Sequence, residues 1–267
     1  MKRIAFLLPS SLLHALRAVR NFTLGAWYRG TARWCPVCRQ SASRFLRFGP
    51  VVTREDARCP HCGALERHRL VWLYWVNRTD LFDGKPKRML HVAPEQCFER
   101  RLRARLGAGY LTADLLDPHT MERMDITDIQ YPDESFDVIY CSHVLEHVPD
   151  DRRAIREFHR VLRKGGWAML LVPITADRTM EDPTVTDPAD RLRLYGQADH
   201  VRRYGPDYVD RLREAGFEVA ITRVSDLIQE DEAVRMGLAA TSAQIYHCRK
   251  AQSAEALPQA RGNPAAR

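Results

Sequence analysis

Four cysteines near the N-terminus have the spacing of a metal site. Two C-x-x-C pairs, Cys35-Pro-Val-Cys38 and Cys59-Pro-His-Cys62, are separated by 20 residues. Each pair can bring two sulfurs to one ion, and four thiolates complete the tetrahedral shell that zinc prefers. Because no position is left for a water molecule or a substrate, such an ion is structural rather than catalytic. The sequence therefore predicts a structural zinc ribbon.

A second group of side chains suited to chemistry lies in the middle of the chain, where His143, Glu146 and His147 follow one another closely. An imidazole can accept a proton near neutral pH, so His143 and His147 are candidate general bases. On an α-helix their rings would share one face at positions i and i+4, which would also allow metal binding. The spacing H-x-x-E-H occurs in inverted zinc peptidases, but the preceding Ser-Phe-Asp strand entry argues against a peptidase. Either ring could instead make only local hydrogen bonds.

The region around these histidines resembles the class I S-adenosylmethionine-dependent methyltransferases, within them the type 11 group. One matching run extends from Met124 to Val148 and contains Ser-Phe-Asp-Val-Ile and Leu-Glu-His-Val. A second run, Glu157 to Gly166, reads Glu-Phe-His-Arg-Val-Leu-Arg-Lys-Gly-Gly. A third begins at His200 and leads to Phe217. The order and spacing of these runs match the family over about residues 88–250.

The resemblance implies a fold, a cofactor and residues that bind it. The fold would be α/β, a Rossmann-like, doubly wound and mainly parallel seven-stranded sheet whose last strand is antiparallel. The cofactor would be S-adenosylmethionine. Asp114, at the end of the second strand, would accept hydrogen bonds from the ribose hydroxyls. Asp125 and Ile126 would hold the adenine, and Cys141 and Ser142 would face the methionine end. In the related ubiquinone-pathway O-methyltransferases an acidic E-x-x-E-H run binds a divalent cation, and here its first position is a histidine.

The first strand departs from the family pattern, in which an acidic residue precedes a G-x-G-x-G loop. The acidic position is His91, and the glycine positions hold Ala93, Glu95 and Cys97. A side chain restricts the close backbone approach that glycine permits. We expect Ala93 and Glu95 to line the cofactor site, with Glu95 paired to the cofactor's α-amino group. The alternative is that the site has been altered or lost.

The elements that must position these residues follow from the hydrophobic pattern. Short apolar runs alternate with helical patterns from Arg88 to about Lys250, as in a doubly wound parallel sheet. The predicted strands are Met89–Ala93, Tyr110–Ala113, Val138–Cys141, Ala168–Val172, Val219–Val224 and Gln244–Cys248. The predicted helices are Phe98–Leu106, Asp151–Leu162 and Pro206–Ala215. Residues 173–203 form an insertion that we expect to build the acceptor pocket, with His200 and Arg202 either binding an acidic substrate or tethering the loop.

Composition and charge divide the chain into four segments. We expect a basic N-terminal arm in 1–33, the zinc ribbon and a connecting helix in 34–76, the methyltransferase domain in 86–250, and a disordered tail in 251–267. No apolar run is long enough to span a membrane, and the seven cysteines do not suggest a secreted disulfide scaffold, so a cytoplasmic protein is expected.

The net charge of +7 is unevenly distributed. Residues 1–76 hold 13 Lys and Arg against three acidic residues, whereas the rest of the chain holds 28 basic and 31 acidic residues. A basic head suggests an anionic partner, such as RNA, a phosphorylated glycan or an anionic membrane surface, although a solvated basic surface would look the same.

These observations favour one function and leave two others open. We expect an S-adenosylmethionine-dependent methyltransferase that acts on a small-molecule or glycan acceptor, since type 11 relatives mostly modify such compounds. The first alternative is an RNA methyltransferase that recruits its substrate through the basic zinc head. The second is a non-catalytic scaffold that has lost the cofactor and keeps the ribbon as a binding module.

Overall fold

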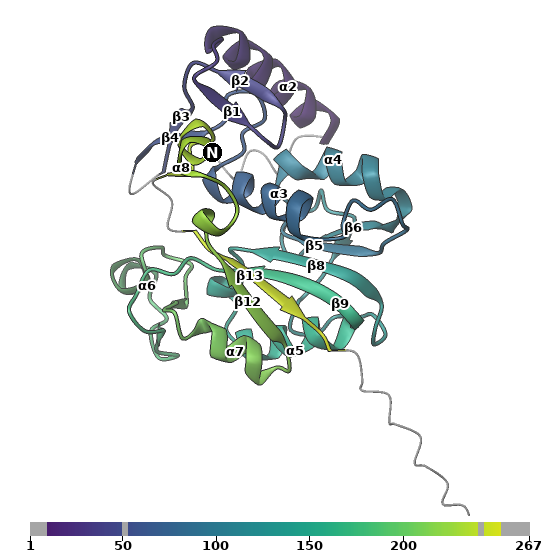
Figure 1. The fold of residues 1–267 in the computed structure, drawn as a ribbon. Helices are drawn as coiled ribbons and strands as arrows, with labels where there is room; N and C mark the ends of the chain where they lie inside the picture. Colours follow the sequence, from purple (N-terminus) through teal and green to yellow (C-terminus); the bar gives the residue numbers. More distant parts are fainter. Residues whose placement is uncertain (1–9, 50–52, 240–242, 252–267) are drawn as a thin grey trace, which may run out of the picture.

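The computed structural model describes residues 10–49, 53–239 and 243–251 (Figure 1). Its centre is a seven-stranded sheet in the order β12-β13-β9-β8-β5-β6-β7. β13 runs antiparallel to both of its neighbours and the other pairs are parallel. The strands are β5 (Met89–Val92), β6 (Tyr110–Asp114), β7 (Glu122–Arg123), β8 (Phe136–Ser142), β9 (Leu162–Leu171), β12 (Glu218–Thr222) and β13 (Ile245–Arg249). The predicted Rossmann-like class, with its antiparallel last strand, is confirmed.

Helices cover both faces of this sheet, as expected for a doubly wound fold (Figure 1). One face carries α3 (Glu66–Arg78) and α4 (Gln96–Leu106), and the other carries α5 (Asp151–Val161) and α7 (Tyr208–Glu214). Central strands are buried from both sides and therefore read as continuous apolar runs, which made them predictable. β7 was missed because two residues carry no readable pattern.

The N-terminal region holds α2 (Ser10–Trp27) and two small antiparallel pairs. The first pair is β1 (Arg33–Cys35) with β2 (Gln40–Ala42), and the second is β3 (Leu46–Phe48) with β4 (Arg54–Arg58). Residues 1–9 of the predicted arm and residues 252–267 of the predicted tail lie outside the described residues.

Helix α3 joins this region to the sheet. Its Trp75 ring contacts Phe98 and Tyr140 at centroid distances of 4.9 Å each. Arg69, fully buried, donates hydrogen bonds to the carbonyls of Ala57 and Ala64, and also to the carbonyl of Gly237, 168 residues further along the chain. A single apolar core therefore extends from the cysteine region to the sheet, while the limits of the predicted domains stay a prediction.

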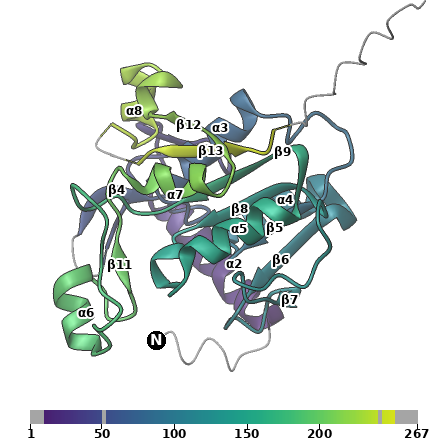
Figure 2. The same cartoon turned by 90° about the horizontal axis from the view of Figure 1, so that it is seen from below.

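The insertion between β9 and α7 contains β10 (Met180–Glu181), α6 (Pro188–Tyr195) and β11 (Arg202–Arg203). Figure 2 shows α6 and β11 at one end of the molecule, beside the sheet. No helix in the described part of the chain is long and apolar enough to cross a lipid bilayer.

Candidate functional site

The four cysteines of the two C-x-x-C pairs come together in one cluster. Their sulfur atoms all lie within 4.8 Å of one another, with Cys35 Sγ 3.7 Å from Cys62 Sγ and Cys38 Sγ 3.7 Å from Cys59 Sγ. A tetrahedral zinc ion with Zn–S bonds of about 2.3 Å holds its sulfurs about 3.8 Å apart, whereas a disulfide would need about 2.05 Å. Gly63, at φ +76°, closes the turn behind the second pair. The donor set fits one tetrahedral zinc ion.

Residues predicted to bind the cofactor come together at the carboxyl edge of the sheet. Val92 pairs with Ala113 on one side and with Cys141 on the other, so the ends of β5, β6 and β8 are level. Beyond these pairs, Ala93 donates its N–H to the Ala113 carbonyl at 2.9 Å. In open α/β sheets, ligands bind beyond this edge.

Ala93 keeps the backbone conformation that a glycine would adopt, because its φ is +49°. Such a φ is uncommon for a residue with a Cβ atom and carries some strain. The loop therefore turns at Ala93 with a backbone conformation that glycine adopts more readily.

Asp114 is the last residue of β6, Asp125 lies two residues after β7, and both keep part of their carboxylates available. Asp114 Oδ1 accepts the N–H groups of Leu116 and Asp117 at 2.7 and 2.8 Å, and no described residue pairs with Oδ2. Asp125 is exposed, and the backbone and hydroxyl of Thr127 bond its Oδ1, which lowers the pKa of Asp125. Ile126, next to it, is buried.

The carboxylate of Glu95 faces the protein interior. Its Oε2 lies 2.7 Å from His91 Nε2, and its Oε1 accepts the Tyr140 hydroxyl at 3.1 Å and lies 3.6 Å from His68 Nε2. Burial raises the pKa of Glu95, but the hydrogen bond and charge of His91 outweigh that effect and hold the pKa at about 2. A cofactor amino group would compete with these partners, so its pairing with Glu95 stays a prediction.

Two residues in the first turn of α3, Arg67 and His68, act on the side chains of this site. The sequence analysis did not predict this. In the first turn of the helix, Glu66 pairs with Arg54 at 2.8 Å, His68 faces Glu95 and Arg69 binds carbonyls. Arg67 alone has no hydrogen-bond or ion-pair partner among the described residues, and its Nε is buried. The available signal was a run of three charged residues and a histidine, Glu66 to Arg69, at the start of a helix otherwise suited to packing.

Arg67 acts electrostatically on the carboxyl edge of the sheet. Its charge helps to lower the pKa of Glu95 and of His143, and it opposes the rise in the pKa of Glu146. The guanidinium of Arg67, in the first turn of α3, therefore places a positive charge near the strand ends that form the site.

The two candidate bases have different surroundings. His143, at φ +57°, is largely buried, and burial lowers its pKa to about 3, so it is neutral at pH 7 but weakly basic. The α-helix on which the two rings would share one face does not form over this motif. Only a 3₁₀ turn, η2 (Leu145–His147), forms before α5 begins at Asp151, so His143 and His147 share no helix face.

His147 instead meets a residue from the insertion. Its ring packs edge-on against that of His200, with centroids 4.7 Å apart. Each ring places Nδ1 near a backbone carbonyl, of Asp199 for His147 at 3.3 Å and of Tyr195 for His200 at 3.2 Å. A donated Nδ1–H leaves Nε2 of each ring free to accept.

Glu146 completes a cluster with these two rings. One ligand atom from each of Glu146, His147 and His200 lies within 4.8 Å of the others. Glu146 Oε2 and His200 Nε2 are buried without a hydrogen-bond partner, and burial raises the pKa of Glu146 to about 7. Unpaired buried polar atoms are costly, so this arrangement suits an incoming hydrogen-bond donor or a divalent cation.

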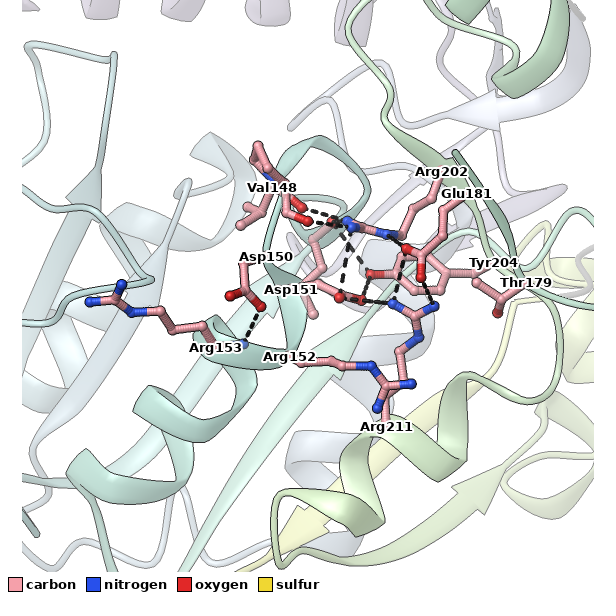
Figure 3. A network of polar contacts seen from close by, with 12 residues as sticks. Val148, Asp150, Asp151, Arg152, Arg153, Thr179, Glu181, Arg202, Tyr204 and Arg211 are labelled. Carbon is pink, nitrogen blue, oxygen red and sulfur yellow. Dashed lines mark hydrogen bonds and ion pairs between the residues drawn. The ribbon is translucent and has the colours of Figure 1, made fainter. Parts of the chain in front are cut away.

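Arg202 tethers a loop, which was one of its two predicted roles. Its guanidinium donates to the carbonyls of Leu145, Val148 and Pro149 and pairs with Glu181 at 2.8 Å (Figure 3). The segment that carries Glu146 and His147 is thereby fixed to β10 and β11.

Acid should destabilise the protein through its buried neutral histidines. Burial lowers the pKa of His68, like that of His143, to about 3, against about 6.5 in an unfolded chain. The unfolded state therefore binds more protons as pH falls from about 6.5 to 3, and each ring contributes a loss of up to about 1.4 kcal/mol per pH unit. Urea unfolding between pH 7 and 4 should show this slope. His143→Asn, which tolerates a positive φ, should flatten it, and an unchanged slope would contradict the assignment.

Comparison with known proteins agrees with this geometry. Residues 88–170 match the family model of a methyltransferase domain. The 27-O-demethylrifamycin SV methyltransferase of Amycolatopsis mediterranei is 36% identical over 110 residues, which cover 40% of this chain and 38% of that protein. The sarcosine/dimethylglycine N-methyltransferase of Halorhodospira halochloris is 33% identical over 104 residues, covering 38% and 34%. The chain thus spans little more than a third of the length of these curated relatives.

A solved structure of an S-adenosylmethionine-dependent methyltransferase from Mesorhizobium loti is also similar. It has a TM-score of 0.45 and 17% identity, over 66% of this chain and 97% of that one. The matched segment, 88–170, contains Ala93, Asp114, Asp125 and Ser142. Residues 88–170 of the chain are therefore similar to a methyltransferase domain.

Proposed function

We propose that this protein transfers a methyl group from S-adenosylmethionine to a small-molecule acceptor, with a glycan among the candidates. The observation that carries the proposal is the level alignment of three strand ends within the matched domain, which brings Ala93, Asp114 and Ser142 to one edge. The names of the relatives, which include an antibiotic precursor and sarcosine, support a small acceptor.

The residues present fit the cofactor at three places. Asp114 offers an unpaired carboxylate oxygen for the ribose hydroxyls, and Asp125 with Ile126 offers an exposed carboxylate beside a buried apolar side chain for the adenine. Cys141 and Ser142 lie at the end of β8, where the methionine end is expected. When bound, the cofactor supplies an electrophilic methyl group, and the protein contributes mainly by positioning it.

His147 is the better placed of the two proposed catalytic bases. Its side chain is about one-third exposed, and the Asp199 carboxylate lies 3.5 Å from Nδ1, which orients the ring. The neighbouring Glu146 and His200 offer unpaired atoms that would hold a hydroxyl or amino group of the acceptor. The zinc ion proposed for Cys35, Cys38, Cys59 and Cys62 has a structural role.

Binding of S-adenosylhomocysteine tests the proposal directly. Calorimetry should show micromolar affinity, and Asp114→Ala should weaken it about 100-fold because a buried polar contact to the ribose is lost. Asp210→Ala, at an exposed aspartate on α7, should bind like the wild type. An absence of heat with the wild-type protein would instead support the non-catalytic scaffold.

The acceptor class requires a separate measurement. The protein and a radiolabelled methyl donor are incubated with small-molecule, glycan and RNA fractions. The label should appear in the small-molecule or the glycan fraction. Labelling of RNA alone would favour the alternative in which the basic zinc head recruits a nucleic acid.

Arg67 should bind an anionic group of one of the two ligands. Its guanidinium is unpaired and partly buried, and a carboxylate would satisfy it through charge-assisted hydrogen bonds. If that carboxylate belongs to the cofactor, Arg67→Gln should weaken S-adenosylhomocysteine about tenfold and leave 5′-methylthioadenosine, which lacks it, unchanged. If it belongs to the acceptor, both nucleosides should bind normally while KM for the acceptor rises. A variant with normal nucleoside binding and normal KM would contradict this role.

A further inference from the structure

Helix α2 presents an apolar stripe that nothing in the described part of the chain covers. Its side chains are between 45% and 84% exposed. They are Leu12, Leu16, Val19, Phe22 and Trp27. Because the spacing is three to five residues, they gather on one side of the helix. Most exposed apolar residues of a soluble domain are scattered, so a continuous row on one element indicates an interaction surface.

The opposite side of α2 is attached to the N-terminal region, so the stripe has a fixed orientation. Gly25 is buried so closely against His61 that an added Cβ would lie 2.4 Å from its ring. Just beyond the helix, the Tyr28 carbonyl accepts the Ser43 N–H at 2.9 Å. Figure 1 shows α2 along the outer edge of this region, away from the central sheet.

The charged residues nearest this stripe in the sequence are all basic, although Asp117 and Glu99 also act on Arg17 of α2. The first 54 residues contain ten Lys and Arg and no Asp or Glu. Within α2 the charged residues are Arg17 and Arg20, and Arg29 and Arg39 are exposed nearby in sequence. The surface that carries the stripe should therefore attract anions and repel cations.

We propose that α2 binds the surface of an anionic lipid bilayer, with its apolar stripe at the headgroup–acyl boundary and its arginines among the phosphates. An interfacial helix of this kind combines Leu, Phe and Trp on one face with Arg on the other and does not span the bilayer. RNA fits less well because three of the five exposed side chains are aliphatic and offer no ring for base stacking. This inference is independent of the proposed methyl transfer.

Co-sedimentation of the full chain with vesicles tests the inference. The protein should bind vesicles of phosphatidylcholine and phosphatidylglycerol in a 3:1 ratio, and binding should weaken at least tenfold in pure phosphatidylcholine or at high salt. Leu16→Glu should weaken binding at least tenfold. Leu192→Glu is the matched control, because Leu192 on α6 is 51% exposed against 54% for Leu16. Equal binding by the two variants would overturn the proposal.

Trp27, at 84% exposure, reports the contact itself. Its fluorescence should shift to the blue when anionic vesicles are added, and Trp27→Phe should remove most of that shift while the folded protein still sediments. Two other occupants of the stripe would also overturn the proposal. One is a lipid-free dimer, seen by ultracentrifugation, that Leu16→Glu dissociates. The other is tight binding of single-stranded RNA that Leu16→Glu abolishes, with no binding to vesicles.

Discussion

Removal of the metal from the cysteine cluster is expected to unfold the N-terminal region and to loosen one face of the central sheet. The four sulfurs lie at zinc-like separations, and a structural zinc site contributes about 10–16 kcal/mol of apparent binding free energy that an apo chain lacks. Helix α3 begins four residues after Cys62 and packs Trp72 and Trp75 against Phe98 of α4. Loss of the ion should therefore also disturb the packing of α3 against α4.

Three measurements check this expectation. Freshly purified protein should contain one zinc per chain. A strong chelator should reduce the near-ultraviolet circular dichroism of the packed tryptophans. Cys59→Ser should lower both the zinc content and this circular dichroism signal. Cys248→Ser is the control, because Cys248 is equally buried but lies in β13, outside the cluster. Less than half an equivalent of zinc, or a chelated protein with unchanged tryptophan signals, would contradict the structural role.

The cysteine cluster shows what local sequence spacing can predict. Two residues between the members of each pair fix the geometry of each half-site, and a 20-residue separation leaves room for the three short strands β2, β3 and β4. The packing of α3 on the sheet was not predictable in the same way. It depends on which apolar surface Trp75 contacts, and its partner Tyr140 lies 65 positions further along the chain.

The candidate site at the strand ends likewise has parts that the sequence predicts and parts that it does not. Asp114 was placed correctly at a strand end because buried parallel strands are recognisable and end at one edge of the sheet. The meeting of His147 with His200 was not foreseen, since it depends on how the insertion folds back across 53 positions. Glu95 is oriented inward by His91, Tyr140 and His68, which come from β5, β8 and α3.

Replacement of Asp151 by Ala should be the most destabilising change in the methyltransferase region. Asp151 is buried, and its carboxylate accepts from Arg211 at 2.8 Å through both oxygens, from the Tyr204 hydroxyl, and pairs with Arg202 at 3.7 Å (Figure 3). Without it, Glu181 supplies the one remaining carboxylate that pairs with these two buried guanidinium groups among the described residues. Removal of one partner from a buried ion pair typically costs about 3–5 kcal/mol.

Urea unfolding measures the stability of Asp151→Ala against that of Asp150→Ala, a substitution at the preceding residue. Asp150→Ala removes only the cap of α5, where the carboxylate accepts the Arg153 N–H at 2.9 Å, and should cost about 1 kcal/mol. Asp151→Ala combined with Arg211→Leu should recover part of the larger loss because one uncompensated charge is removed. If Asp151→Ala costs no more than Asp150→Ala, the network does not stabilise the fold.

The network also links stability to the acceptor side of the proposed site. Arg202 holds the carbonyls of Leu145 and Val148, which flank Glu146 and His147. A weakened network should therefore let this segment move and raise KM for the acceptor, while the affinity for S-adenosylhomocysteine, which depends on Asp114 at another strand, stays the same. A parallel loss of both affinities would instead indicate general unfolding, because only the acceptor side is attached to Arg202.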